Sequence, residues 1–217
     1  MFFHRSFPQR EGNFLKNIAV YGHFYQPPRE DPWLGVVPPD PSAAPARDWN
    51  TRILTECYLP NSEATLLGPN GWIESKRNNY LDLNFDFGPT LHKWIEGANE
   101  HLNNAICEAS DRALAQCYNH IIMPLATAQD KLTQVLWGKA DFKYRFGIEP
   151  KGMWLPECAV DTATLETLAS CGITFTILAP RQCRAVIDEN GTTMTPGGAG
   201  LDVTRPYLCE LPSGRTI

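Results

Sequence analysis

One carboxylate stands out from the rest of the sequence by its position. Glu157 follows the apolar run Gly152–Pro156, which reads as a short buried strand, and Asp161 opens a helix-like segment directly afterwards. In α/β domains the residue at the carboxyl end of a strand points into the ligand crevice, so packing is a poor explanation for a carboxylate there. Such a group can attack the anomeric carbon of a sugar, act as a general base, or bind a metal ion. Glu157 is therefore the candidate catalytic residue.

Polar residues fall at the ends of three predicted strands, and their common location suggests a shared crevice. His120, taken singly, could equally be a buried histidine with satisfied hydrogen bonds. Three such coincidences favour a polar site over chance. The three groups are His23 with Tyr25 and Gln26, Asn119 with His120, and Trp154 with Glu157.

The spacing of the histidines and acids gives no metal motif. Neither His-x-x-x-His nor Glu-x-x-His occurs, so a catalytic metal would need ligands from scattered positions such as His23, His92 and His120. No Gly-x-Gly-x-x-Gly or Walker loop is present, and Gly197–Gly200 is interpreted as a flexible loop. Cys158 adjoins the candidate carboxylate, but neighbouring residues point in different directions, and we interpret it as a packing residue. The sequence thus predicts no metal and no cofactor.

Hydrophobic periodicity predicts strands and helices that alternate along the chain. The clearest helix is Ala128–Phe146, which Gly147 ends, and another follows Asp161 as its N-cap. The predicted strands span residues 17–24, 80–87, 118–123, 152–156 and 173–178, and further helices span about 49–58, 89–95 and 102–113. This alternation favours parallel βα units, in a barrel or an open doubly wound sheet, with active groups at the carboxyl ends of the strands.

Loops and chain ends complete the predicted organisation. The connection Gln26–Arg47 holds seven prolines, which excludes a helix or a central strand; it is either a functional loop or a flexible surface insertion. Residues 1–16 read as a loose leader. Turn signals at Asp188–Gly191 and Leu211–Ile217 predict hairpins, and the second has barely begun its outgoing strand. We therefore expect a domain truncated at its C-terminus, since barrels typically need about 250 residues.

Composition limits the class of protein. The 217 residues are 43% hydrophobic, carry a formal charge of −5 and lack clusters of Lys and Arg, which argues against nucleic-acid or membrane partners. No apolar run reaches membrane-spanning length, and the first residues do not read as a signal peptide. Seven scattered cysteines without a Cys-x-x-Cys pair indicate reduced thiols in a cytoplasmic protein. The sequence carries no signal for an oligomeric state.

Two motifs and one histidine together carry a family likeness. They are Trp-Leu-Pro-Glu-Cys-Ala at 154–159, His-Phe-Tyr-Gln-Pro at 23–27, and His120 between them. They resemble the motifs of glycoside hydrolase family 57, over about residues 17–183. The resemblance implies an α/β fold with an incomplete seven-stranded TIM-like (β/α) barrel, of which residues 17–217 form the N-terminal part. It further implies a retaining glycosidase or transglycosidase that acts on α-glucan, as amylases, glucanotransferases and branching enzymes do.

The resemblance also implies a role for each matched residue. Glu157 takes the place of the nucleophile that forms a covalent glycosyl enzyme. Tyr25 replaces the second histidine of the family's usual His-x-His-Gln-Pro motif. The substrate-binding groups implied are His23, Gln26, His120 and Trp154.

The second catalytic carboxyl group is missing from this match. The family's general acid is an aspartate well downstream of the nucleophile, and neither Asp188 nor Asp202 is a good counterpart, so the acid is expected beyond Ile217. A retaining glycosidase needs two carboxyl groups about 5–5.5 Å apart, so residues 1–217 alone are expected to be inactive. The implied partner is an oligo- or polysaccharide. Two other classes stay open: a metal-dependent polysaccharide deacetylase, and a non-catalytic carbohydrate-binding protein.

Overall fold

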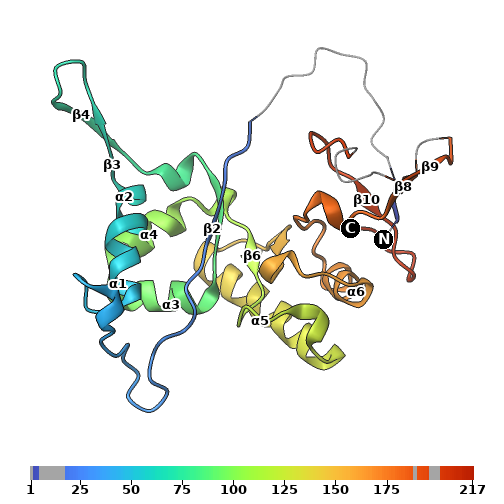
Figure 1. The fold of residues 1–217 in the computed structure, drawn as a ribbon, viewed down its shortest axis with the longest axis horizontal. Helices are drawn as coiled ribbons and strands as arrows, with labels where there is room; N and C mark the ends of the chain where they lie inside the picture. Colours follow the sequence, from blue (N-terminus) through green and yellow to red (C-terminus); the bar gives the residue numbers. More distant parts are fainter. Residues whose placement is uncertain (1, 5–17, 188–189, 196–200) are drawn as a thin grey trace. The chain divides into compact units, whose positions relative to one another are not determined.

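The chain folds into two compact units of mixed α and β structure (Figure 1). The computed structural model describes residues 2–4, 18–187, 190–195 and 201–217. We call Ala19–Leu114 together with Asp141–Ile148 the first unit. The second unit comprises the described residues of Met1–Ile18, Ala115–Ala140 and Glu149–Ile217. Each unit contains one part of the predicted site.

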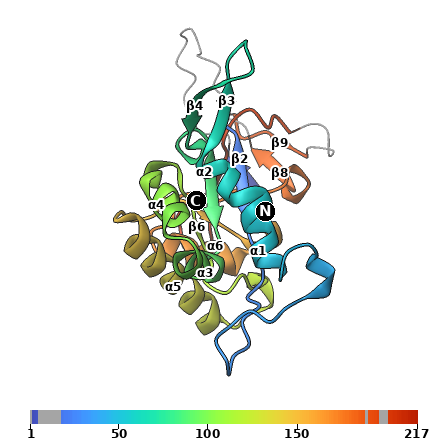
Figure 2. The same ribbon diagram turned by 90° about the vertical axis from the view of Figure 1, so that its left-hand side faces the viewer.

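The first unit is built around two parallel strands and the helices that follow them. Strand β2 pairs with β5 in parallel register, so that His23 lies opposite Asp86, and a parallel bridge joins Phe85 to Ala113. A β3–β4 hairpin projects from the helices of this unit (Figures 1 and 2). Its elements are β2 (Tyr21–Phe24), η1 (Pro41–Ala43), α1 (Trp49–Ile53), the π-helical turn η2 (Leu54–Tyr58), α2 (Leu59–Ser62), β3 (Ala64–Leu67), β4 (Ile73–Arg77), η3 (Asn79–Leu81), β5 (Asn84–Phe87), α3 (Pro89–Ala98), α4 (Glu100–Glu108) and η4 (Ser110–Arg112).

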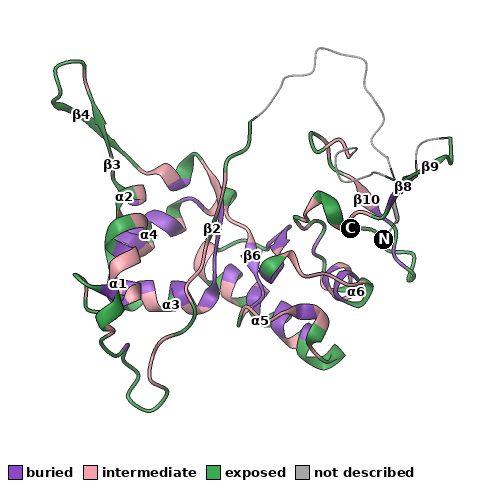
Figure 3. Ribbon diagram, viewed as in Figure 1, coloured by how far each residue is buried: buried purple, intermediate pink, exposed green. Residues whose placement is uncertain are grey.

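Buried aromatic and aliphatic side chains form the core of the first unit (Figure 3). Helix α3 starts with Pro89 at its first turn, where no amide donor is needed, and Asn99 caps α4 by accepting the Leu102 amide at 2.8 Å. Each large apolar side chain removed from water contributes about 1.5–3 kcal/mol. The largest fully buried ones are Tyr58, Tyr80, Phe85, Leu91, Ile95, Leu102 and Ile106.

Two strand predictions in this unit were only partly correct. The predicted strand 17–24 forms only over Tyr21–Phe24, and Ile18 and Val20 are 94% and 61% exposed, so they are not a buried run. The predicted strand 80–87 forms only over Asn84–Phe87, and it buries Phe85, Asp86 and Phe87 in succession. A parallel strand covered on both faces buries consecutive residues, including its carboxylate.

The second unit contains a second pair of short parallel strands and a separate small sheet. Strand β6 pairs with β7, so that Gln116 lies opposite Trp154, and Gly152 bridges to Phe175. The four-stranded sheet has the order β10-β1-β8-β9. The elements are β1 (Phe2–His4), β6 (Ala115–Gln116), η5 (Met123–Leu125), α5 (Ala128–Phe146, of which Ala128–Ala140 belongs to this unit), β7 (Met153–Trp154), η6 (Pro156–Cys158), α6 (Thr162–Ser170), η7 (Pro180–Gln182), β8 (Ala185–Ile187), β9 (Thr193–Met194) and β10 (Leu208–Cys209).

Two local features fix the helices beside β6 and β7. Gly138 lies so close to β6 that a Cβ atom there would sit 2.1 Å from the carbonyl oxygen of Gln116, so only glycine permits this approach. Asp161 caps α6 by accepting the Thr164 amide at 2.7 Å, and its carboxylate pairs with the buried Lys131 at 3.0 Å. The helix boundaries predicted at Ala128–Phe146 and after Asp161 are confirmed.

Other predictions in this unit were wrong. The predicted strand 118–123 does not form, because the observed strand β6 covers only Ala115–Gln116, and the predicted strand 173–178 is reduced to the bridge at Phe175. Phe2–His4, placed in the loose leader, forms β1 between β8 and β10 (Figure 1). Across the described residues the sheets are short, and they form no closed barrel.

Several smaller predictions concern loops and thiols. Cys209 and Ile217 exchange backbone hydrogen bonds of 2.8 and 3.1 Å, which confirms the C-terminal hairpin. The turn at Asp188–Gly191 lies partly outside the described residues, as Gly197–Gly200 does entirely, although β8 and β9 pair antiparallel on either side of the turn. All seven cysteines are free. In the part of the chain that the structure describes, no helix combines the length and apolar character needed to span a membrane.

Candidate functional site

Glu157 lies at a sharp corner directly after β7. Its backbone is left-handed, with φ 56° and ψ 19°, and Cys158 follows with φ 52°. Two consecutive non-glycine residues in this region store strain of about 1–3 kcal/mol each, and such strain concentrates at functional sites. The carboxylate side chain is 75% exposed. The fold thus presents this carboxylate to solvent in a backbone conformation that ordinary packing does not require.

His120 lies beside Glu157 and is held by the neighbouring strand. Its Nε2 atom is 3.9 Å from the Glu157 Oε1 atom, and its side chain is only 7% exposed. Its Nδ1 atom is 2.9 Å from Oε1 of Gln116, a buried residue on β6. With that oxygen as acceptor, Nδ1 carries the proton and Nε2 is the atom turned toward the carboxylate. His120 is also left-handed, with φ 54°, so both polar residues sit on strained backbone.

The residues next to Glu157 have different roles. Trp154 is half-buried and occupies the β7 position opposite Gln116. Burial, and then the negative charge of Glu157, raise the pKa of the Cys158 thiol. A raised pKa makes a cysteine a poorer nucleophile at neutral pH, in agreement with a packing role for Cys158.

His23 in the first unit is oriented by a buried carboxylate. The His23 Nδ1 atom is 2.8 Å from the Asp86 Oδ2 atom, and the Tyr21 hydroxyl donates to the other oxygen of Asp86. Asp86 is fully buried, while the His23 side chain is 31% exposed. As a carboxylate Asp86 only accepts, so His23 donates from Nδ1 and the neutral ring carries its lone pair on Nε2. This tautomer suits an acceptor for a hydroxyl group.

Gln26 belongs to a hydrogen-bonded group at the start of the proline-rich loop. Its Oε1 atom accepts from Arg29, which also donates to Oδ1 of the buried Asn50 at 3.0 Å. Tyr58 lies in the same group: burial is the main cause that raises the pKa of its hydroxyl, and a hydrogen bond with Gln26 acts in the opposite direction. The proline-rich connection Gln26–Arg47 is therefore anchored at Gln26 through side chains from α1 and η2.

We expect Asp86→Asn to change the tautomer of His23 while the fold is retained. The amide that replaces one carboxylate oxygen can donate to Nδ1, which moves the histidine proton to Nε2 and removes the acceptor there. The chemical shifts of the ring nitrogens in ¹⁵N NMR measure this change. Asp82→Asn, at an exposed carboxylate paired with Arg77, is the matched control. An unchanged tautomer in Asp86→Asn would contradict the orientation of His23 by Asp86.

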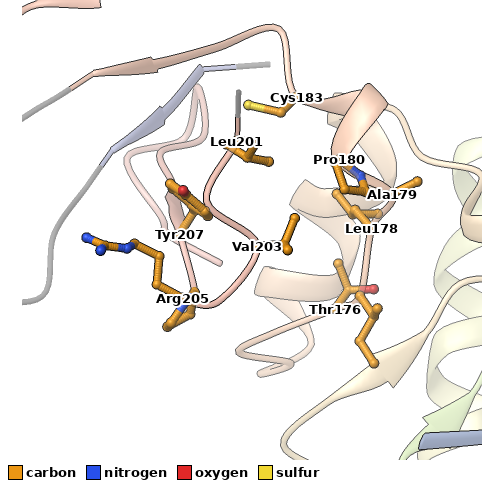
Figure 4. Close-up of a pocket in the computed structure, with 11 residues that line it drawn as sticks. Thr176, Leu178, Ala179, Pro180, Cys183, Leu201, Val203, Arg205 and Tyr207 are labelled. Carbon is orange, nitrogen blue, oxygen red and sulfur yellow. The ribbon is translucent and has the colours of Figure 1, made fainter. Parts of the chain in front are cut away.

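A cavity of about 270 Å³ lies in the second unit, between the segment 176–183 and the loop 201–207 (Figure 4). Asp202 belongs to this loop, and its carboxylate accepts hydrogen bonds from Thr204 and Arg205. The hydrogen bonds from Thr204 are the main cause that lowers the pKa of Asp202. A general acid needs a raised pKa, so Asp202 is poorly suited to that role, as the sequence predicts.

Some residues of the site could not be recognised in the sequence. Gln116 is hydrogen-bonded to His120, and Asp86 is hydrogen-bonded to His23. Neither Gln116 nor Asp86 was predicted as a site residue. Asp86 had one usable signal, a lone carboxylate near the end of an aromatic strand. Within the described ranges, no three His, Cys, Asp or Glu side chains gather where they could hold a metal ion. The structure brings Glu157 and His120 together in the second unit, and His23 and Gln26 lie in the first.

The described residues form a mixed α/β fold in which polar groups follow the carboxyl ends of short parallel strands, the position where α/β proteins usually bind their ligands. Residues 4–209 match glycosyl hydrolase family 57, and the chain belongs to this family. No curated protein matches it.

Solved structures of several enzymes share this fold. The 4-α-glucanotransferase from Thermococcus litoralis is 16% identical, with a TM-score of 0.53 over 74% of this chain and 22% of its own. An exo-type maltose-forming amylase from Pyrococcus sp. ST04 is 13% identical, with a TM-score of 0.53 over 74% of this chain and 28% of its own. The α-amylase AmyC from Thermotoga maritima is 14% identical, with a TM-score of 0.51 over 82% of this chain and 45% of its own. This chain thus spans less than half of each, and the likeness shows the fold alone.

Proposed function

We propose that the protein is a retaining glycosidase or transglycosidase that acts on α-glucan, with Glu157 as its nucleophile. The observation that carries the proposal is the exposed carboxylate of Glu157 on strained backbone, 3.9 Å from a histidine. Family membership supports this role, because this corner holds the motif that suggested the nucleophile. In the reaction, Glu157 attacks the anomeric carbon as the glycosidic bond breaks and the general acid protonates the leaving oxygen. Water or a sugar hydroxyl then attacks the same carbon, breaks its ester bond to Glu157 and releases the sugar from the enzyme.

The substrate-binding roles follow from the same proposal. His120 lies beside the carboxylate and would bind a hydroxyl of the sugar that reacts, with Trp154 as an apolar surface for a sugar ring. His23 and Gln26 would bind further hydroxyl groups, since each is hydrogen-bonded to a buried residue, Asp86 or Tyr58. Polar groups held in this way lose little freedom when substrate binds.

The proposal extends to the complete fold, the acid and the cellular compartment. We expect the parallel strands to be part of the family's incomplete TIM-like barrel, and a carboxyl group other than Asp202 to be the general acid, because hydrogen bonds from Thr204 lower the pKa of Asp202. We also expect a cytoplasmic protein. The seven free cysteines support a reducing compartment.

The test is to incubate the complete protein with maltoheptaose and follow the products by proton NMR. A retaining mechanism is expected to release the α-anomer first, and stopping turnover with acid should trap a glycosyl ester on the peptide that contains Glu157. Initial release of the β-anomer would refute retention. No turnover of maltoheptaose, together with release of acetate from an acetylated glycan that a chelator abolishes and zinc restores, would favour the metal-dependent deacetylase. Binding without turnover would favour a carbohydrate-binding protein.

A further inference from the structure

Hydrogen bonds within the turn at Glu157 do not fix every peptide group of this corner. Within the turn, the Cys158 amide donates to Leu155 O at 2.9 Å, and the Ala159 amide donates to Pro156 O at 2.9 Å. These bonds do not use the carbonyl of Cys158, the second left-handed residue. Since the left-handed region is unfavourable for a side chain with a Cβ atom, an additional contact is needed to fix this peptide.

Gln182 supplies that contact from η7. Its Nε2 atom donates to the carbonyl oxygen of Cys158 at 2.6 Å. Its Oε1 atom accepts the amide of Ala179 at 2.7 Å, and the Gln182 amide donates back to Ala179 O at 2.9 Å. The carboxamide of Gln182 therefore donates to the corner at Cys158 and accepts from Ala179 in its own turn. Gln182 is half-buried. Both turns belong to the second unit.

We infer that Gln182 is a positioning residue: it holds the Cys158 carbonyl and thereby aims the Glu157 carboxylate. The inference rests on the proposed function, in which Glu157 is the nucleophile. Positioning matters because a displacement of about 1 Å in a reacting group can cost about 10²-fold in rate. Gln182 itself touches no reacting atom in this scheme.

The substitution Gln182→Glu distinguishes the hydrogen bond that the Gln182 carboxamide donates from the one that it accepts. A carboxylate of the same length still accepts the Ala179 amide, but it cannot donate to Cys158 O and places two acceptors together. Gln182→Met keeps the length and apolar contacts and removes both hydrogen bonds, so it serves if the charged variant does not fold. Gln129→Glu, at an exposed position on α5, makes the same chemical change away from the corner.

The experiment measures covalent labelling of the complete protein by 5-fluoro-α-D-glucosyl fluoride. The Glu157 oxygen forms a bond to the anomeric carbon as the carbon–fluorine bond breaks and fluoride leaves with the electron pair. Because fluoride needs little help from a general acid, the labelling rate reports on the nucleophile. We expect Gln182→Glu to label about 10²-fold more slowly at saturating probe, with the probe concentration for half-maximal rate little changed.

The pH dependence gives a readout that a merely structural role would not move. Below the usual glutamic acid pKa of about 4.3, the new side chain is protonated and can donate to Cys158 O again. The ratio of variant to wild-type labelling rate should therefore rise as the pH falls, whereas Gln182→Met should show no such recovery. Labelling of Gln182→Glu or Gln182→Met as fast as Gln129→Glu would overturn the positioning role. Absence of label on Glu157 in the wild-type protein would instead overturn the proposed function.

Discussion

Replacing Glu157 by glutamine should lower turnover of α-glucan by about 10⁴-fold or more, because an amide cannot form the covalent intermediate and losses of this size follow removal of a nucleophile. The substitution preserves shape and hydrogen-bonding length, so binding of maltoheptaose should change little. The side chain is 75% exposed, and stability should stay within about 0.5 kcal/mol of the wild type. Release of reducing ends, calorimetric binding and thermal unfolding measure the three quantities.

A matched control and a rescue sharpen this result. Glu74→Gln changes an exposed glutamate on β4 and should keep full turnover. Glu157→Ala leaves space for azide, which should attack the same face as the missing carboxylate and give a β-glycosyl azide at a partly restored rate. Unaltered turnover of Glu157→Gln would remove Glu157 from the mechanism. Failure of both variants to bind maltoheptaose would make Glu157 a binding residue instead.

The features that the sequence predicted well are those determined by local chemistry. Helix α5 matches its predicted bounds because apolar spacing and Gly147 define it within one segment. Asp161 as an N-cap is another local signal, since its side chain bonds to an amide three residues away. The strand-to-turn corner at Glu157 was likewise visible, as an apolar run ending in a proline and a carboxylate.

The features that failed depend on distant partners. Strand 118–123 was predicted from its β-forming residues, but the paired strand ends at Gln116 and His120 is left-handed. Asp86 lies within the predicted strand 80–87, and only the parallel pairing with β2 places its buried carboxylate against His23. Gln182 gives no sequence signal, because its partner Cys158 lies 24 positions away. These contacts join residues that lie far apart in the sequence. Local sequence patterns therefore do not show which strands and side chains will pair.

The second large effect concerns stability: lowering the pH from about 6.5 to about 4.5 should destabilise the first unit through His92. His92 lies on α3 and is only 1% exposed, between the rings of Phe87 and Phe146 at 5.7 and 5.8 Å. Its Nε2 atom is 4.0 Å from the Cys107 sulfur. Burial lowers the pKa of His92 to about 3, and the positive charge of Arg145 acts in the same direction.

The sign follows from proton binding in the two states. The unfolded histidine takes up a proton near pH 6.5, whereas the folded one does so only near pH 3. The unfolded state therefore binds more protons between these values, and the free energy of unfolding falls by about 1.4 kcal/mol for each pH unit in that interval. Well above pH 6.5, His92 is neutral in both states and does not reduce the free energy of unfolding. Below pH 6.5, protonation of the unfolded state progressively lowers that free energy. Between about pH 6.5 and 4.5 the loss should be about 2 kcal/mol, because the unfolded histidine is already half protonated at pH 6.5.

Comparison with His92→Gln isolates this effect from the other groups that titrate. Burial raises the pKa of the nearby Asp141, so its own contribution to stability grows as the pH falls, opposite in sign to that of His92. Urea unfolding at about pH 6.5 and 4.5 should show a loss about 2 kcal/mol smaller in His92→Gln than in the wild type, while Asp141 contributes equally to both proteins. His101→Gln, whose side chain is 60% exposed, should retain the wild-type loss. An equal loss in wild type and His92→Gln would mean that His92 accepts a proton in the folded protein without opening the core, and the aromatic packing around it would then need to admit water.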